Sequence, residues 1–534
     1  MRDDITLLDE NDTIDDIKNE VLYHVAKAAF EDNLDGILAR LPYEILPGSK
    51  PSFRCCVYKE REIIRERIML AQNINPATGE PCHNTVQIIP AACENCPIAR
   101  FSVTDNCQKC MGKACQNACN FGAIEMGRHR SHIDASKCKE CGKCAQACPY
   151  HAIAALKRPC KFSCPVDAIS YDENGISVIN EEKCIRCGLC IHRCPFGAIG
   201  SKTFIVDVIK AIKSEHPVYA LVAPATEGQF GEHITMNSWK KAMKAVGFTD
   251  LVEVGLGGDM TAAYEAEEWA EAYKNGKKMT TSCCPAFVNM VKKHYPELIE
   301  NVSTTISPMC AVSRMLKAKE PDAVTVFIGP CISKKSEVKD HAIEGNADYA
   351  LTYSEIRAIM HARNVELEED DNSYQESSIY GKRFANSGGV TEAVLRRLSP
   401  DHSKEAMHEI AECGVRGEEG IKEFTVPYKG MDINVCVASG LANARTVMER
   451  VKNGEANYHL IEVMACRRGC IMGGGQPTRS GDRTKAARAR GLYNADNTMI
   501  IKKSDENPLV LELYEGLLKG KEHHLLHNEF YIKD

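Results

Sequence analysis

The sequence predicts three consecutive parts: a mainly helical segment over residues 1–90, a cysteine-rich α+β region over 91–200, and an α/β domain over 201–534. Three observations support this division. A chain of 534 residues is too long for one hydrophobic core. Nineteen of its 27 cysteines lie before residue 200. Beyond residue 202, short apolar runs alternate with amphipathic stretches, which is the pattern of a parallel sheet covered by helices.

The first part contains two helix-like stretches, residues 13–41 and 59–72. We interpret it as a helical cap that packs on the rest of the chain. Its cysteines Cys55, Cys56 and Cys82 fit no ligand spacing. Residues 200–202 (G-S-K) are interpreted as a short linker to the third part.

Composition limits the class of protein. With 44% hydrophobic residues, 26% charged residues and a net charge of −7, the chain resembles ordinary soluble globular proteins, with no sign of a nucleic-acid partner. No segment approaches the ~18 consecutive apolar residues of a membrane span, and the N-terminus is acidic, unlike a signal peptide. These features predict a cytoplasmic protein without membrane contact. Since the cytosol keeps thiols reduced, the many cysteines indicate metal ligands and not disulfides.

Two cysteine runs in the second part have the C-x2-C-x2-C-x3-C-P spacing of bacterial two-cluster ferredoxins, and they predict a ferredoxin-like α+β fold. In that arrangement the fourth cysteine of each run ligates the other cluster. One [4Fe–4S] cubane is therefore assigned to Cys138, Cys141, Cys144 and Cys194, and a second to Cys184, Cys187, Cys190 and Cys148. Zinc is the weaker alternative, because zinc knuckles use paired C-x2-C elements without the Cys-Pro ending.

Two further pieces look like irregular copies of the same half-ferredoxin unit. They contain Cys107, Cys110, Cys115 and Cys119 before N-F-G-A-I, and Cys160 and Cys164 before P-V-D-A-I. The regular runs precede P-Y-H-A-I and P-F-G-A-I. Cys93 and Cys96 can supply the ligands that the shorter copy lacks. This internal repeat predicts two to four accessory cubanes, with four if all 16 cysteines are ligands. The alternatives are that the irregular copies keep one cluster or are a metal-free scaffold.

The third part alternates strand-like and helix-like stretches at 218–222, 238–246, 251–254 and 262–273. Three cysteine motifs follow: T-S-C-C-P-A-F at 281–287, P-C-I-S-K-K-S-E at 330–337, and E-V-M-A-C-R-R-G-C-I-M-G-G-G-Q-P at 462–477. They adjoin strand-like runs at 278–281, 323–328 and 459–464, so we expect them to meet where parallel strands end. A further cubane needs four thiolates, and Cys284, Cys331, Cys466 and Cys470 can supply them.

These motifs closely resemble those of the [FeFe]-hydrogenases, over roughly residues 203–534. The resemblance implies a catalytic domain of two parallel-sheet lobes with the active site in the cleft between them. It also implies the H-cluster, a [4Fe–4S] cubane bridged through Cys470 to a diiron unit that carries CO, CN⁻ and an azadithiolate. The implied reaction is 2H⁺ + 2e⁻ ⇌ H₂, and most of the diiron chemistry belongs to the cofactor.

The resemblance implies roles for residues around the diiron unit. Lys334 matches a lysine that pairs with an iron-bound cyanide, although a surface lysine is the alternative. Pro224 and Ala225 match residues that contact the second cyanide. Met464 matches a methionine packed on the diiron unit, and an ordinary core methionine is equally compatible with the sequence.

A proton relay is also implied. Cys283 matches the cysteine that protonates the azadithiolate, and a thiol pKa of ~8.5 is within a modest shift of neutral pH. Glu265, Glu268 and Ser303 match the rest of the relay. The i, i+3 spacing puts the two carboxylates on one helical face, although a solvated helix has the same pattern. An arginine often found four positions beyond the second glutamate is Ala272 here.

Five positions in and near the motifs depart from the best-known enzymes and resemble a less-studied bacterial branch. Gly329 replaces a methionine that flanks the diiron site, Met309 and Cys310 replace a pair of glutamines, and Ala286 and Phe287 replace a glycine and a tryptophan. The sequence thus predicts a hydrogenase that exchanges electrons with a soluble carrier such as ferredoxin and depends on cofactor maturation proteins. The alternative is a non-catalytic iron–sulfur scaffold or a hydrogen sensor.

Overall fold

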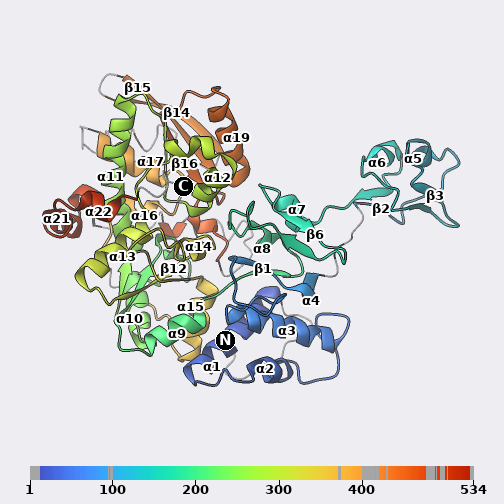
Figure 1. Cartoon of the computed structure of the whole chain (residues 1–534), viewed down its shortest axis with the longest axis horizontal. Helices are drawn as coiled ribbons and strands as arrows, with labels where there is room; N and C mark the ends of the chain where they lie inside the picture. Colours follow the sequence, from blue (N-terminus) through green and yellow to red (C-terminus); the bar gives the residue numbers. More distant parts are fainter. Residues whose placement is uncertain are drawn as a thin grey trace.

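The computed structural model describes residues 13–93, 96, 100–231, 233–370, 375–399, 410, 415, 420–428, 431–476, 488, 490–492, 500–501 and 503–528. Two four-stranded sheets lie one above the other on the left of Figure 1, and the cysteine-rich part extends to the right. We call them the upper and the lower sheet. None of the helices in the described part combines the length and hydrophobicity that a membrane span requires.

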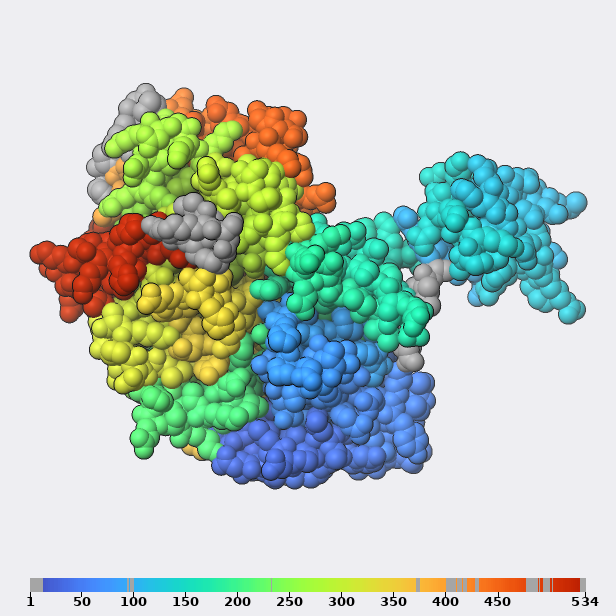
Figure 2. Space-filling view, in the orientation of Figure 1, coloured from blue at the N-terminus to red at the C-terminus, as the bar shows by residue number. Residues whose placement is uncertain are grey.

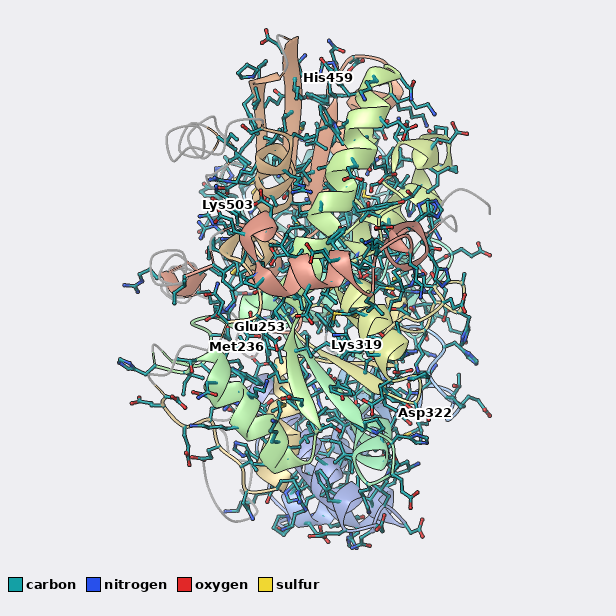
Figure 3. All side chains as sticks on the ribbon, turned by 90° about the vertical axis from the view of Figure 1, so that its left-hand side faces the viewer. Met236, Glu253, Lys319, Asp322, His459 and Lys503 are labelled. Carbon is teal, nitrogen blue, oxygen red and sulfur yellow. The ribbon has the colours of Figure 1, made fainter. Side chains whose placement is uncertain are left out.

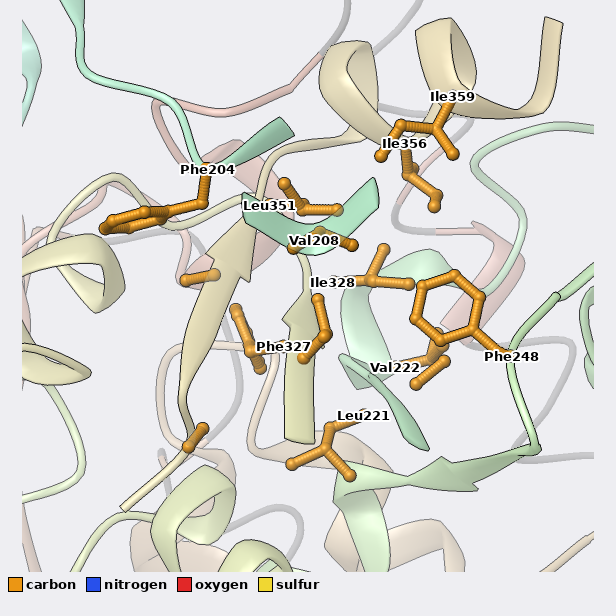
Figure 4. Close-up of a cluster of buried hydrophobic side chains, with 14 of the residues drawn as sticks. Phe204, Val208, Leu221, Val222, Phe248, Phe327, Ile328, Leu351, Ile356 and Ile359 are labelled. Atoms are coloured by element: carbon orange, nitrogen blue, oxygen red, sulfur yellow. The ribbon is translucent and has the colours of Figure 1, made fainter. Parts of the chain in front are cut away.

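The lower sheet is entirely parallel. Its strand order is β10 (Asp250–Glu253), β9 (Val218–Val222), β12 (Val324–Ile328) and β13 (Tyr349–Leu351). Helices α9 (Ile205–Ile212), α10 (Met236–Val246), α13 (Pro308–Lys319) and α15 (Tyr353–Ala362) pack on it. Both faces are buried, as expected for a parallel sheet rich in Val, Leu and Ile (Figure 4).

The upper sheet is mixed. Its order is β11 (Met279–Thr280), β16 (Leu460–Met464), β15 (Met431–Ser439) and β14 (Ile421–Tyr428). The first three strands are parallel, but β14 is antiparallel to β15. The prediction of two all-parallel lobes was therefore wrong at this edge. Helices α12 (Pro285–His294), α17 (Gly389–Leu398) and α19 (Leu441–Lys452) lie in the same part of the chain.

A long helix, α11 (Val254–Lys274), connects the two sheets. Figure 3 shows it rising from Glu253, at the end of β10, toward His459, just before β16. The indole of Trp269 donates to the His459 carbonyl at 3.3 Å. The predicted helix over 262–273 lies within α11, which begins eight residues earlier than predicted. Glycines at 257 and 258 concealed this part of the helix in the sequence.

The N-terminal helices are α1 (Ile14–Phe30), α2 (Ile37–Ile45) and α3 (Val57–Ala71). The helix-like stretch 13–41 is thus interrupted after Phe30, where Asp32 and Gly36 have left-handed backbone angles. Buried side chains of α1, such as Val21 and Val25, belong to the same hydrophobic core as the lower sheet. The described N-terminal helices therefore pack on the lower sheet.

The cysteine-rich part forms two small modules. The first, residues 100–155, contains the strand pairs β2 (Phe101–Val103) with β5 (Ile153–Ala155) and β3 (Ile124–Met126) with β4 (Ser131–Ile133), and helices α5 (Ala114–Asn117) and α6 (Lys143–Ala147). It stands apart from the rest of the molecule, and we call it the head (Figures 1 and 2).

The second module, residues 156–201, lies against the two-sheet part, and we call it the base. It contains α7 (Pro159–Ser163), β6 (Ile169–Tyr171), β7 (Ser177–Ile179), α8 (Leu189–Arg193) and β8 (Ile199–Ser201). Helix α4 (Pro90–Cys93) precedes the head. The interpretation of residues 200–202 as a linker was wrong, because β8 pairs with β1 (Val86–Ile88). That partner lies more than 100 residues earlier and leaves no local signal.

Candidate active site and iron–sulfur sites

The three cysteine motifs converge on one cavity. It lies where β9, β11, β12 and β16 end, so the carboxyl ends of parallel strands from both sheets face it. Its lining includes most of the residues predicted for the active site: Cys283, Cys284, Cys331, Cys466, Cys470, Lys334, Pro224, Ala225, Met309 and Met464. The predicted residues Gly329, Glu265, Glu268 and Ser303 lie outside this lining.

Local structure positions the four predicted cubane ligands. Cys284 is the N-cap of α12, with proline at the first helical position. Between Cys466 and Cys470 the chain turns at Gly469, whose φ is +94°. A Cβ at Gly469 would lie 2.5 Å from the Ala385 carbonyl oxygen, so only glycine fits there. The glycine run that follows packs against the second motif, because Gly475 N donates to the Pro330 carbonyl at 2.6 Å.

The cavity disfavours charge on these thiols. Burial raises the pKa of Cys331 to about 11 and also raises the pKa of Cys284, Cys466 and Cys470. Four such thiols become thiolates together only with a bound cation. Among the described residues, no three Cys, His, Asp or Glu side chains converge closely enough for a single ion. The donor set of four cysteines therefore fits an iron–sulfur cluster better than one metal ion.

Lys334 is a buried cation beside these cysteines. Its ammonium forms an ion pair with Oε2 of Glu337 at 2.5 Å. Burial opposes its charge, yet attraction to Glu337 prevails and raises the pKa of Lys334 above its usual value. A buried ammonium that lines the cavity fits an anionic group placed there. Sequence reasoning missed Glu337, although its i, i+3 spacing from Lys334 was visible.

A chain of polar side chains leads away from Cys283. Burial, followed by repulsion from Glu265, raises the pKa of the Cys283 thiol well above its usual value. The shift is therefore upward, away from neutral pH, and it favours the protonated thiol. Glu265 is buried on α11, and its Oε1 has no hydrogen-bond partner among the described residues. Burial, with repulsion from Glu268 and Glu462, raises the pKa of Glu265 well above 4.5.

Ser303 connects the two glutamates. Its hydroxyl acts to lower the pKa of Glu265 and donates to Oε2 of Glu268 at 2.6 Å. Glu268 is half-buried and also accepts from Thr304 N and Thr304 Oγ1, both at 2.8 Å. In the structure, Cys283, Glu265, Ser303 and Glu268 thus follow one another in space, each beside the next. Thr304 and Glu462 were not predicted.

The structure also locates the residues that depart from the known motifs. Met309 is fully buried and lines the cavity. Gly329 does not line it, because the ring of Phe327 fills the adjacent space. A Cβ at Gly329 would lie 2.7 Å from Cζ of Phe327 and 2.7 Å from the Cβ of Ala223. Phe327, Phe384 and Ala385 line the cavity without having been predicted.

The accessory cysteines form groups that differ from the predicted ones. Cys164 lines a pocket with Cys184, Cys187 and Cys190, and Cys148 lines another with Cys107, Cys110 and Cys115. Cys119 neighbours Cys138 and Cys144, and Cys194 neighbours Cys93, Cys96 and Cys160. The assignment of Cys194 to the run at 138–144, and of Cys148 to the run at 184–190, was wrong. The two regular runs lie in different modules. In each module, the fourth cysteine of the regular run lies with the cysteines of the irregular copy, and the last cysteine of the irregular copy lies with those of the regular run.

The base module adjoins the cavity. Cys187 lines both its own pocket and the cavity. The next residue, Gly188, packs on Ile332, because a Cβ there would lie 2.8 Å from Cγ1 of Ile332. His192 bonds to the Gly474 carbonyl at 2.5 Å. One accessory cysteine group is therefore next to the candidate active site.

Fold and site together define a hydrogenase-like iron–sulfur protein, and comparisons with known proteins identify the family. The C-terminal domain of the iron-only hydrogenase large subunit matches residues 216–474, and the 4Fe–4S binding domain matches 131–154 and 177–200. The iron hydrogenase small subunit matches 482–533, a segment that sequence reasoning had not distinguished. This chain belongs to the iron-only, or [FeFe]-, hydrogenase family.

Individual relatives agree with this assignment. Iron hydrogenase 1 of Clostridium pasteurianum is 31% identical over 442 residues, which are 74% of this chain and 75% of that one. The periplasmic [Fe] hydrogenase large subunit of Nitratidesulfovibrio vulgaris is 32% identical over 399 residues, or 68% and 91% of the two chains. The structure of apo [FeFe]-hydrogenase HydA1 from Chlamydomonas reinhardtii matches with a TM-score of 0.50 and 26% identity, covering 60% of this chain and 98% of that one.

More distant relatives are named for a different function. The cytosolic Fe-S cluster assembly factor narfl of Xenopus tropicalis is 24% identical over 312 residues, covering 52% of this chain and 64% of that one. Membership of the broader group of similar proteins therefore does not by itself define the activity.

Proposed function

We propose that this protein is a cytoplasmic hydrogenase that interconverts H₂ with protons and electrons. The observation that carries the proposal is the composition of one cavity. Four cysteines, the buried ammonium of Lys334 and the protonated thiol of Cys283 all line it. A protein that only carries a cluster needs the four thiolates alone. The ammonium of Lys334 and the proton donor Cys283 have a use in a hydrogenase, which must bind an anionic cofactor and deliver protons to it.

We propose that Cys284, Cys331, Cys466 and Cys470 hold the cubane of an H-cluster, with Cys470 shared with the diiron unit. When bound, this group supplies the redox chemistry at which two protons and two electrons combine. Lys334 would pair with an anionic ligand of the diiron unit, while Pro224, Ala225, Met309 and Met464 exclude water around it.

The chain's own residues would move the protons. Cys283 holds a proton at the wall of the cavity, and Glu265 is the next carboxyl along. Glu265 and Glu268 share Ser303 as a neighbour, and Glu268 is half-buried. Because burial raises the pKa of Glu265, this carboxyl holds a proton more readily than an exposed glutamate and is suited to passing it on. This arrangement supports proton transfer through Cys283, Glu265, Ser303 and Glu268.

Electrons would travel through four accessory [4Fe–4S] clusters, two in the head and two around the base. The four cysteine groups support this number, and Cys187 beside the cavity supports electron entry from the base. A soluble carrier such as ferredoxin is the proposed electron partner, and maturation proteins would install the diiron unit.

The competing function is an iron–sulfur assembly factor, which relatives such as narfl favour. Infrared spectroscopy of the protein matured with diiron-assembly enzymes separates the two. A hydrogenase should show CO and CN⁻ bands and produce H₂ from reduced methyl viologen. Absence of both from protein with a fully loaded cubane would reject the hydrogenase and leave the assembly role.

A further inference from the structure

The head carries exposed apolar side chains around one of its cysteine groups. The pocket lined by Cys107, Cys110, Cys115 and Cys148 is also lined by Lys109 and Tyr150. Met111 adjoins Cys110 in sequence and is 97% exposed, and Tyr150 is 50% exposed. Methionine and tyrosine are enriched at protein interfaces, so their exposure beside a redox site indicates a contact surface.

The charge of the head is opposite to that of the whole chain. Residues 100–155 contain eight Lys and Arg against four Asp and Glu, while the chain carries a net charge of −7. Three of the four acidic residues pair within the head: Asp105 with Arg130 at 2.7 Å, and Glu125 and Asp134 with Lys137 at 3.5 and 3.3 Å. The remaining basic side chains dominate its surface.

Several of these basic residues surround the same pocket. Lys113 lies in the loop between Cys110 and Cys115, and Lys109 Nζ donates to the Arg128 carbonyl at 2.9 Å, which brings Arg128 beside it. Neither Lys113 nor Arg128 forms an ion pair with a carboxylate in the described part of the chain. We define the head patch as Lys109, Met111, Lys113, Arg128 and Tyr150. All five residues are exposed. The module that carries them projects from the rest of the molecule (Figure 2).

We propose that the head patch docks a small acidic electron-carrier protein. This inference rests on the proposed function and adds the entry point and the charge of the partner. In the transfer itself, one electron leaves the carrier's reduced cluster and reduces the head cluster, and no bond forms or breaks. The patch combines exposed apolar and basic side chains, which suits a protein more than a nucleic acid, and its charge would steer an acidic partner to it.

The test compares two variants with the same change in net charge. Lys113→Glu/Arg128→Glu alters the head patch, and Lys50→Glu/Lys319→Glu alters exposed lysines elsewhere. H₂ evolution is measured against the concentration of a reduced, acidic two-cluster bacterial ferredoxin, at about 20 mM and about 500 mM NaCl. Iron content and the rate with reduced methyl viologen check that each variant is folded and loaded.

The head variant should raise KM for ferredoxin about ten-fold at low salt, with a much smaller effect at high salt, because screening removes the steering. The control variant and the methyl viologen rate should change little. Equal KM changes in both variants, or none in the head variant, would overturn the proposal. So would binding of single-stranded DNA, but not of ferredoxin, that is lost in the head variant.

A direct binding measurement separates this proposal from the proposed function. Calorimetric titration of the iron-loaded protein with oxidised ferredoxin requires no turnover. If the protein makes no H₂ from methyl viologen but binds ferredoxin through the head patch, the hydrogenase proposal fails and the docking proposal stands. If it makes H₂ from methyl viologen but the head variant binds ferredoxin as the parent does, docking at this patch is rejected.

Discussion

Adjacent cysteines in the first motif have different proposed roles, and substitution can separate them. Cys284→Ala removes a cubane ligand and should prevent stable loading of the H-cluster. Cys283→Ala should leave every cluster present and lower turnover by ~10² to 10⁴, the typical contribution of a positioned acid–base group. Cys283→Asp should recover part of the activity. Iron content, infrared bands and H₂ turnover would check this, and parent-level turnover by fully loaded Cys283→Ala would contradict the relay.

Glu265 gives a prediction about stability as well as activity. Its pKa is raised above the usual 4.5, so the folded protein binds more protons than the unfolded chain at this site. Its contribution to the free energy of unfolding therefore falls as pH rises above ~4.5. Glu265→Gln removes the titrating group and therefore this pH-dependent loss of stability. The melting temperature of the variant minus that of the parent should increase from about pH 5 to about pH 8. Glu267→Gln, an exposed change on the same helix, should show no such trend.

Gly329 and Phe327 should be energetically coupled. Since a Cβ at Gly329 would clash with Phe327 and Ala223, Gly329→Met alone should lower stability by about 1–3 kcal/mol. Phe327→Ala opens space beside it. The double variant should therefore be more stable than the sum of the single effects, by about 0.5–3 kcal/mol. Denaturant unfolding of the four proteins measures this coupling, and simple additivity would show that Phe327 does not fill the position left by the missing methionine.

At the level of elements, the close packing of α11 on α13 depends on one glycine. A Cβ at Gly257 would lie 2.1 Å from the Pro308 carbonyl oxygen, a backbone atom that cannot rotate away. Gly257→Ala should therefore destabilise the protein by about 1–3 kcal/mol, despite the better helix propensity of alanine. Gly48→Ala, in open space, should change stability by less than about 0.5 kcal/mol. Thermal unfolding followed by circular dichroism would compare them.

Elements with strong local signals were predictable from the sequence. Strands β9 and β16 fall within one residue of the predicted runs, because continuous Val, Leu and Ile segments are typical of buried parallel strands. The antiparallel edge strand β14 and the pairing of β8 with β1 could not be predicted from the sequence, because they depend on which strands pair in the fold. The cysteine motifs predicted most of the cavity lining, while Phe384 and Ala385 carry no recognisable pattern.

At the scale of the whole molecule, the exchange of fourth cysteines between neighbouring copies predicts the metal content. Four accessory cubanes and an H-cluster give about 22 iron atoms per chain, whereas two accessory cubanes give about 14. Because each irregular copy lies beside a regular one, we expect about 22. Anaerobic iron analysis of the matured protein decides between them. As a finer check, Cys164→Ala should disturb the cluster of Cys184, Cys187 and Cys190, whereas Cys148→Ala should spare it.

Helix α1 is buried in the same core as the lower sheet. The three parts predicted from the sequence are therefore not three independently inherited domains. A fragment starting at residue 201 would leave α9 and α15 without the apolar cover that Val21 and Val25 provide. It would also lack the pairing of β8 with β1, because both strands lie almost entirely before residue 201. The α/β part of this chain should therefore lose stability without residues 13–90. In descent, loss of the N-terminal helices would require compensating polar substitutions on the apolar surface that they vacate.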